Sequence, residues 1–230
     1  MLDLSTDEGL FAALRDTLFT AVVGDVLDKM GHRRQFLPQP IGPLRQDMRI
    51  VGRAMPVLEA DVFDEIAETT RGPLGGRPFG LMMEALDDLK PGEVYIASGA
   101  SLNYALWGEL MSTRALHLRA AGAVLNGFVR DAAGIEALNF PTFCRGTYAQ
   151  DQGPRGKVID FRVPIEIEGI RIRPGDLLFG DREGVLVIPK AAEREAIEAA
   201  LQKASTENRV AVAIREGMSA REAFDTFGVL

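Results

Sequence analysis

The sequence predicts an α/β fold, and three observations support this prediction. Strand-like and helix-like segments alternate between residues 94 and 145, which is the order expected of a sheet covered by helices. Between residues 158 and 188, short apolar runs are separated by turns that contain glycine, and this pattern predicts a β meander. From residue 190 onward, the chain is expected to end in helices.

The first part of the chain is expected to hold one helix and one strand. Apolar residues near helical spacing predict a helix over 7–30, which Gly31 ends. The segment 33–47 is rich in proline and glutamine and is expected to be a loop, whereas 49–60 is apolar and β-branched enough for a strand. Residues 61–77 end in a run of glycine and proline and are expected to form a flexible crossing.

The middle of the chain carries the alternation. We expect helices over 79–89, 104–120 and 132–138, and strands over 94–97, 123–128 and 141–145. The last helices are expected over 190–216 and 220–227. No internal repeat and no linker interrupts the sequence, so we predict a single domain over 1–230 with a C-terminal helical arm at about 190–230.

Composition narrows the class of protein. The chain has 230 residues, 47% of them hydrophobic, which suits one sizeable core. The net charge is -7 and no basic stripe with interleaved aromatic residues is present, so we expect no nucleic-acid partner. No apolar run reaches the length of a membrane span, and the N-terminal residues do not resemble a signal peptide. With a single cysteine, Cys144, these features lead us to expect a cytoplasmic protein without a membrane partner.

Residue counts also restrict the possible chemistry. Only two histidines are present, His32 and His117, so any bound metal is expected to be a hard cation held by oxygen atoms. Neither histidine lies in a setting typical of a serine nucleophile. A Schiff-base enzyme needs a desolvated lysine, and the candidate lysines lie at expected turns, helix ends or exposed faces. The sequence therefore favours metal-assisted over imine chemistry.

A first candidate site segment is 107–111, with the sequence Trp-Gly-Glu-Leu-Met. A glycine near a helix start lets a ligand approach free backbone N–H groups, and the helix dipole favours a carboxylate there. The alternative is that Trp107, Leu110 and Met111 belong to a packing face, which is the commoner meaning of apolar residues at helical spacing.

A second segment, 122–131, runs from a buried apolar strand directly into Arg130 and Asp131. Ligand sites of α/β sheets gather at the carboxyl ends of strands. Arginine can bind a carboxylate or an enolate with two hydrogen bonds, and an adjacent aspartate can hold a hard cation. This pair suits a 2-oxo acid. The alternative is a local turn in which Asp131 caps the following helix.

Two further segments carry polar residues. In 174–189, Asp176 and Asp181 are expected to be turn residues rather than metal ligands. The polar loop 146–156 is open to three interpretations, namely a substrate gate, a solvated loop or a subunit contact.

Four motifs in this order resemble one family. They are 107–111 (Trp-Gly-Glu-Leu-Met), 126–131 (Asn-Gly-Phe-Val-Arg-Asp), 174–176 (Pro-Gly-Asp) and 180–185 (Gly-Asp-Arg-Glu-Gly-Val). Together they resemble the 4-hydroxy-4-methyl-2-oxoglutarate / 4-carboxy-4-hydroxy-2-oxoadipate aldolases, a family that includes the regulator of ribonuclease E activity A. The likeness extends from the helix at 24–28 to Pro189.

The resemblance implies a compact α/β sandwich related to the swivelling phosphohistidine domains. It also implies a homo-oligomer, a trimer or a hexamer, with sites at subunit clefts. The implied activity is a pyruvate aldolase that uses a divalent cation, Mg²⁺ or alternatively Mn²⁺, and that also decarboxylates oxaloacetate.

Site residues follow from the same resemblance. The backbone of Gly108, Glu109, Leu110 and Met111 would bind the carboxylate of a small 2-oxo acid. Arg130 would bind the 2-oxo acid and stabilise the enolate, and Asp131 would be the direct metal ligand. Glu109 would hold or activate a water.

Glu207, in the expected C-terminal helix, is similar to a family glutamate that reaches the metal-bound waters of a neighbouring subunit. Two departures from the family concern the substrate rather than the type of reaction. Asn126-Gly127 stands where relatives often have Asp-Gly, and the loop 148–156 is longer than in the shortest members.

A rival interpretation comes from the regulator branch, whose members bind and inhibit an endoribonuclease without catalysis. The aspartate of the Arg-Asp pair is kept by the aldolases and lost by the regulators, and this chain keeps it as Asp131. A methyltransferase is a third interpretation, but the sequence shows no glycine-rich cofactor loop.

Overall fold

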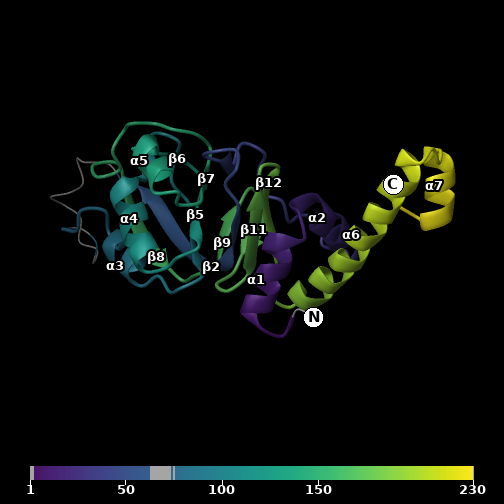
Figure 1. Cartoon of the computed structure of the whole chain (residues 1–230). Helices are drawn as coiled ribbons and strands as arrows, with labels where there is room; N and C mark the ends of the chain where they lie inside the picture. Colours follow the sequence, from purple (N-terminus) through teal and green to yellow (C-terminus); the bar gives the residue numbers. More distant parts are fainter. Residues whose placement is uncertain (1–2, 63–73, 75, 230) are drawn as a thin grey trace. The chain divides into compact units, whose positions relative to one another are not determined.

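The computed structural model describes residues 3–62, 74 and 76–229, and the chain separates into two compact units (Figure 1). One unit is formed by residues 34–190, and the other combines the residues up to 33 with those from 191 onward. The predicted α/β class is confirmed. Most of the expected crossing at 61–77 lies outside the described residues, and a single domain over 1–230 stays a prediction.

Within the described part of the unit 34–190, eight strands form one mixed sheet. They are β1 (Gly42–Pro43), β2 (Ile50–Asp61), β3 (Glu93–Ser98), β5 (Gly122–Leu125), β7 (Thr142–Cys144), β8 (Gly156–Phe161), β11 (Leu177–Asp181) and β12 (Gly184–Ile188). Their order is β1-β7-β5-β3-β2-β11-β12, and β8 pairs with the second half of β2. Neighbours among β2, β3, β5 and β7 run parallel, which confirms the predicted strand and helix alternation. The edge strand β1 also contacts β11 and β12, so the sheet curls toward closure.

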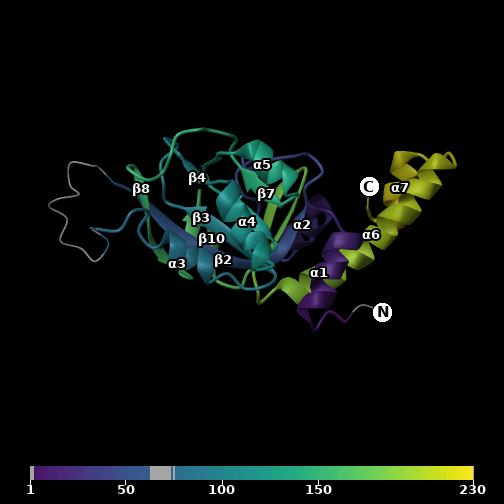
Figure 2. The ribbon, with the colours of Figure 1, turned by 60° about the vertical axis from the view of Figure 1, so that its left-hand side comes forward.

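Each face of this sheet has its own core. Helices α3 (Met82–Asp87), α4 (Glu109–His117) and α5 (Ala132–Ala137) supply side chains to the core on one face (Figures 1 and 2). The hairpin of β9 (Ile165–Ile167) and β10 (Ile170–Ile172) buries its four isoleucines in the core on the other face. Because β2 is covered on both faces and has neighbours on both edges, it is almost continuously buried, which explains its long apolar run.

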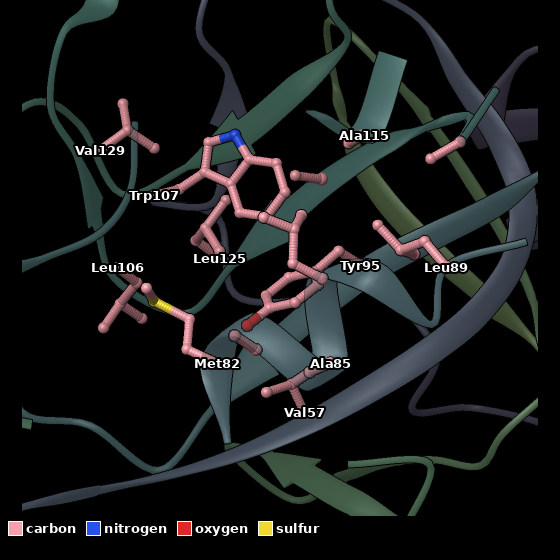
Figure 3. Close-up of a cluster of buried hydrophobic side chains, with 14 of the residues drawn as sticks. Val57, Met82, Ala85, Leu89, Tyr95, Leu106, Trp107, Ala115, Leu125 and Val129 are labelled. Atoms are coloured by element: carbon pink, nitrogen blue, oxygen red, sulfur yellow. The ribbon is translucent and has the colours of Figure 1, made fainter. Parts of the chain in front are cut away.

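A small parallel sheet outside the main one positions the candidate site. It consists of β4 (Ala105–Trp107) and β6 (Phe128–Val129). Trp107 is 1% exposed and lies among Leu125, Val129 and Tyr95 in the core (Figure 3). Its indole centroid is 4.8 Å from the Tyr95 ring, and its Nε1 donates to Ser112 Oγ at 2.7 Å. This burial fixes the end of β4.

The predicted helix 104–120 was wrong over its first residues. Residues 105–107 form β4, and the helix begins at Glu109 after the N-cap Gly108. All three β4 side chains are buried, and a strand buries consecutive residues only when both of its faces are covered. That covering comes from distant parts of the chain, so local spacing did not reveal it.

Other boundaries also differ from the predictions. The expected strand 123–128 ends at Leu125, and β6 follows after the bend at 126–127. The expected meander is instead the strand β8 followed by two hairpins, β9 with β10 and β11 with β12. It is not a meander because β8 and β11 each pair with β2, whereas β9 and β10 form a separate sheet. The short strand β1 lies in the expected loop 33–47, where it pairs with β7. The helix expected over 79–89 is shorter, at 82–87.

The second unit is helical. It contains α1 (Asp7–Asp16), α2 (Thr20–Lys29), α6 (Glu193–Arg215) and α7 (Ala220–Phe227), and α6 contacts the other three (Figure 1). The two C-terminal helices are confirmed. The single helix expected over 7–30 was wrong, because the chain is extended at Phe19. This break divides the apolar residues between two short helices that both pack on α6. Among the described residues, no helix combines the length and apolar character needed to cross a bilayer.

Candidate active site

The site is built where the two strands of the small sheet end. Since β4 and β6 run parallel, their carboxyl ends lie side by side. Gly108 directly follows β4, and Arg130 directly follows β6. The Arg130 N–H donates to the carbonyl oxygen of Trp107 at 2.9 Å. The two candidate segments, 107–111 and 126–131, are therefore brought together by backbone pairing, as ligand sites at strand ends require.

Asp131 has an unusual backbone conformation. Its φ is 55° and its ψ 36°, the left-handed region that a residue with a side chain adopts at a cost. It occupies the N-cap position of α5, as the alternative interpretation predicts, but its side chain makes no capping hydrogen bond. The side chain is 45% exposed, and its Oδ2 lies 3.6 Å from Arg130 Nε. The carboxylate is thus available to a ligand.

Gly108 makes room for that carboxylate. A Cβ atom at Gly108 would lie 2.8 Å from Asp131 Oδ2 and 3.3 Å from Arg130 Cγ. Its φ of -152° is ordinary extended backbone, so the requirement at this position is space rather than conformation. No side chain among the described residues caps α4, so the first N–H groups of the helix are left without a capping partner beside Gly108.

The alternative packing role of 107–111 holds for only part of the segment. Trp107 is buried, whereas Leu110 is 83% exposed and Met111 is half-buried. Ser112 Oγ accepts from Trp107 and donates to the Gly108 carbonyl oxygen at 3.1 Å, which ties the first turn of α4 to the core. The N-terminus of α4 is therefore fixed in position but open at its surface.

Glu109 lies against the next helix. A Cβ atom at Gly134 would be 2.3 Å from Glu109 Oε2, so this glycine on α5 is the surface on which the carboxylate rests. Gly134 N–H in turn donates to the Asp131 carbonyl oxygen at 3.0 Å. Glu109 and Asp131 therefore both border the first turn of α5, whose dipole favours negative charge.

Asp151 was not among the predicted site residues. Its Oδ1 accepts a hydrogen bond from Arg130 Nη1 at 2.6 Å. It comes from the polar loop 146–156, which follows β7 and lies beside β6 through a bridge between Thr147 and Val129. The polar composition of this loop was the only sequence signal, and it did not single out Asp151.

The oxygen atoms at this site suit a hard cation. Among the described residues, no three His, Cys, Asp or Glu side chains converge on a metal-sized space. Mg²⁺ commonly keeps several waters and uses only one or two protein carboxylates. Asp131, whose side chain is half exposed beside Gly108, fits the role of such a carboxylate. Glu109, which borders the same first turn of α5, is the candidate to hold a water.

Other candidates lie elsewhere. Asp176 accepts from the N–H groups of Arg173 and Lys190, and Asp181 accepts from that of Glu183, which confirms both as turn residues. Glu207 lies in α6 of the other unit, where Lys203 donates to it, and its role toward a neighbouring subunit stays a prediction. A surface hollow of about 570 Å³ is lined by Met83, Glu84, Asp87, Asp88 and Phe161, none of which was predicted.

Lys203, a candidate lysine expected at a turn, a helix end or an exposed face, lies mid-helix with a largely buried side chain. The Lys203 side chain is 13% exposed, and burial acts to lower its pKa. Hydrogen bonds to Asp25 and Glu207 outweigh this effect and raise the pKa above its ordinary value. The amine therefore stays protonated, whereas a Schiff-base lysine must be neutral to attack.

Two curated relatives are similar over most of this chain. A protein of Halalkalibacterium halodurans, provisionally named 4-hydroxy-4-methyl-2-oxoglutarate aldolase, is 32% identical over 90% of each chain. Protein DlpA of Legionella pneumophila is 29% identical over 90% of this chain, which spans only 32% of the length of DlpA.

Solved structures and a family profile complete the comparison. An uncharacterized protein from Pseudomonas syringae pv. tomato matches with a TM-score of 0.82 and 28% identity, over 96% of this chain and 94% of its own. Streptomyces coelicolor RraAS2, described as an unusual member of the RNase ES inhibitor RraA family, shares the fold with a TM-score of 0.74 and 22% identity, over 88% of this chain and 96% of its own. Since the profile described as Aldolase/RraA matches residues 20–187, the chain belongs to the RraA-like, Aldolase/RraA family.

Proposed function

We propose that the protein is a divalent-metal-dependent lyase that releases pyruvate from a 4-hydroxy-2-oxo acid such as 4-hydroxy-4-methyl-2-oxoglutarate. One observation carries this proposal. The parallel pairing of β4 with β6 places an uncapped helix N-terminus, an arginine and an exposed carboxylate side by side. These are the groups that a 2-oxo acid and a hard cation together require.

Substrate binding uses backbone and side chain together. The N–H groups at the start of α4, over Glu109 to Met111, bind the carboxylate of the 2-oxo acid. The Arg130 guanidinium binds a second substrate oxygen. Because β4 and β6 fix both groups through backbone hydrogen bonds, the substrate is oriented without rearrangement of the chain.

Cleavage breaks the C3–C4 bond of the substrate. A water held by Glu109 passes the proton of the 4-hydroxyl group to the Glu109 carboxylate, a carbonyl forms at C4, and the electrons of the broken C3–C4 bond form the enolate of pyruvate. The same proton then returns through the water to C3. Arg130 neutralises the enolate charge, and protonation at C3 completes pyruvate. A cation held by Asp131, Mg²⁺ or Mn²⁺, supplies Lewis-acid polarisation of the 2-oxo group. Oxaloacetate fits the same groups, with carbon dioxide as the leaving fragment.

Assembly and partners belong to the same proposal. We expect a homotrimer or homohexamer in which Glu207 from a neighbouring subunit reaches the waters of the metal. The only other partner we propose is the small 2-oxo acid.

The experiment that tests the proposal measures pyruvate released from 4-hydroxy-4-methyl-2-oxoglutarate and from oxaloacetate. Wild type is compared with Asp131→Ala, with Mg²⁺ and with EDTA. We expect release that needs Mg²⁺ and falls at least ~10²-fold in the variant, because the metal loses its carboxylate ligand. The variant should fold, since the Asp131 side chain is half exposed and caps nothing.

Asp47→Asn is the matched control, because it removes an exposed carboxylate paired with Arg45 outside the site. Full activity in Asp131→Ala would remove Asp131 from the mechanism. Absence of pyruvate from both compounds in wild type would contradict this substrate class and favour the rival interpretation, a non-enzymatic inhibitor of an endoribonuclease.

A further inference from the structure

Arg130 has a carboxylate partner that neither cleavage nor metal binding requires. Asp151 Oδ1 accepts from Arg130 Nη1 at 2.6 Å, and no hydrogen bond joins Nη2 to another described residue. One edge of the guanidinium is thus held by the protein, while other N–H groups remain for a ligand. Since a free arginine side chain samples many rotamers, a fixed partner on one edge limits where the rest can point.

Asp151 is itself held in place. Its Oδ2 accepts from the N–H of Gly153 at 2.9 Å, and its backbone carbonyl oxygen accepts from Arg155 Nη1 at 3.1 Å. Each oxygen of the carboxylate therefore has one donor, and only one of these donors is Arg130. The loop arranges the carboxylate independently of the arginine that it binds.

The next residue fastens the loop to the core. Gln152 is 3% exposed, and its Nε2 donates to Glu59 Oε2 at 2.6 Å. Glu59 is 2% exposed on β2, where it pairs with β8, and its second oxygen, Oε1, has no hydrogen-bond partner among the described residues. Burial raises the pKa of Glu59 to about 8, so the acid is mainly neutral at pH 7. Burying a polar pair of this kind costs free energy of folding, which is a reason to ask what structural role the pair has.

On the basis of the proposed function, we propose that Asp151 is a positioning residue that holds the Arg130 guanidinium for the 2-oxo acid. The buried hydrogen bond between Gln152 and Glu59 fastens the loop that carries Asp151. Glu59 in the core binds Gln152, the neighbouring Asp151 is thereby held in place, and Asp151 in turn binds Arg130. Asp151 acts through Arg130 and does not itself bind the substrate.

The test observes Arg130 directly, by NMR of the protein labelled with ¹⁵N-arginine. The signal of Arg130 Nε–Hε is assigned by its loss in Arg130→Lys. In Asp151→Ala we expect rotation of the guanidinium about the Nε–Cζ bond to be about tenfold faster, because a charge-assisted hydrogen bond is lost. Asp151→Asn should give an intermediate rate, since the amide offers one acceptor oxygen where the carboxylate offers two.

Asp47→Asn, which removes another Asp–Arg pair, should leave the Arg130 rotation rate unchanged. An unchanged rate in Asp151→Ala would overturn the proposal. The NMR result does not depend on catalysis, so a wild type that releases no pyruvate would contradict the proposed function alone.

Kinetics then separate positioning from a purely structural role. In Asp151→Ala we expect kcat/KM for pyruvate release to fall about 10- to 100-fold. Asp151→Asn should recover part of this loss, and the melting temperature of both variants should stay close to that of wild type. If wild type releases pyruvate, equal activity in Asp151→Ala would also overturn the proposal.

The anchor has its own pair of variants. Gln152→Met keeps the side-chain volume and removes the donor, so Arg130 rotation should quicken as in Asp151→Ala. Glu59→Gln keeps an acceptor for Gln152 and should leave the rotation rate at the wild-type value. If Gln152→Met leaves Arg130 unaffected, the buried pair has no part in positioning Asp151.

Discussion

Arg130 works through the shape of its guanidinium as well as through its charge. Nη1 donates to Asp151, and Nε lies 3.6 Å from Asp131 Oδ2. A lysine supplies one point charge and cannot bind on two edges at once. We therefore predict that Arg130→Lys lowers kcat/KM for pyruvate release at least ~10²-fold, a loss of about 3 kcal/mol of transition-state stabilisation.

The control for this substitution is Arg45→Lys, at an arginine that pairs with Asp47 outside the site. Steady-state kinetics at saturating Mg²⁺ make the comparison. Near-normal kinetics in Arg130→Lys would mean that Arg130 has only a structural role.

At the scale of elements, the junction between β4 and α4 is where the site is most constrained. Gly108 is extended, so alanine can adopt its backbone conformation, but the added Cβ would fall 2.8 Å from Asp131 Oδ2. We predict that Gly108→Ala displaces the Asp131 carboxylate and lowers metal-dependent activity at least ~10-fold. Its melting temperature should change little, because the displaced group is a half-exposed side chain.

Gly42→Ala is a suitable control for that experiment. A Cβ at Gly42 would meet nothing within 4 Å, and Gly42 does not have a positive φ. Calorimetric titration of Mg²⁺ should show weaker binding in Gly108→Ala and unchanged binding in Gly42→Ala. Equal affinities in the two variants would mean that Gly108 does not make space for a metal ligand.

Elements with a clear apolar pattern were predictable, whereas those that depend on distant partners were not. The strand at 49–60 and the helix at 132–138 were found within one or two residues. In contrast, β4 was predicted as the start of a helix, since Tyr104, Leu106 and Trp107 are compatible with either conformation when no partner is known. Pairing with β6, which joins Ala105 to Phe128 and Trp107 to Val129, decides for the strand.

At the scale of the whole molecule, Glu59 should make stability depend on pH. Burial is the main cause that raises its pKa, to about 8. The hydrogen bond from Gln152 lowers the pKa by a smaller amount, and the charge of Asp61 raises it slightly. Tyr95 and Tyr104 also face Glu59, and both have pKa values raised above the ordinary range, so they stay neutral across this window. Between pH 5 and 8 the folded state therefore binds more protons than the unfolded state.

Stability consequently falls as pH rises from about 5 to 8, where the buried carboxyl begins to ionise. We predict that Glu59→Gln abolishes this fall and melts about 5 °C or more above wild type at pH 8. Thermal unfolding followed by circular dichroism at pH 5, 6.5 and 8 measures the effect. Glu84→Gln, at an exposed glutamate paired with Arg77, should keep the wild-type pH dependence, and a Glu59→Gln variant that also keeps it would refute this assignment.

The sequence by itself determined the α/β class, the C-terminal helices and the two segments that carry the site. It could do so because apolar periodicity is local, and because Arg130 and Asp131 follow closely after a predicted apolar strand. The tertiary structure alone decided that these segments meet, that the Asp131 side chain makes no capping hydrogen bond, and that Asp151 binds Arg130. It also revealed the buried pair of Glu59 and Gln152, which are 93 residues apart in the chain. The physical reason is that strand pairing and burial join distant residues, and neither leaves a signal in the spacing of neighbours.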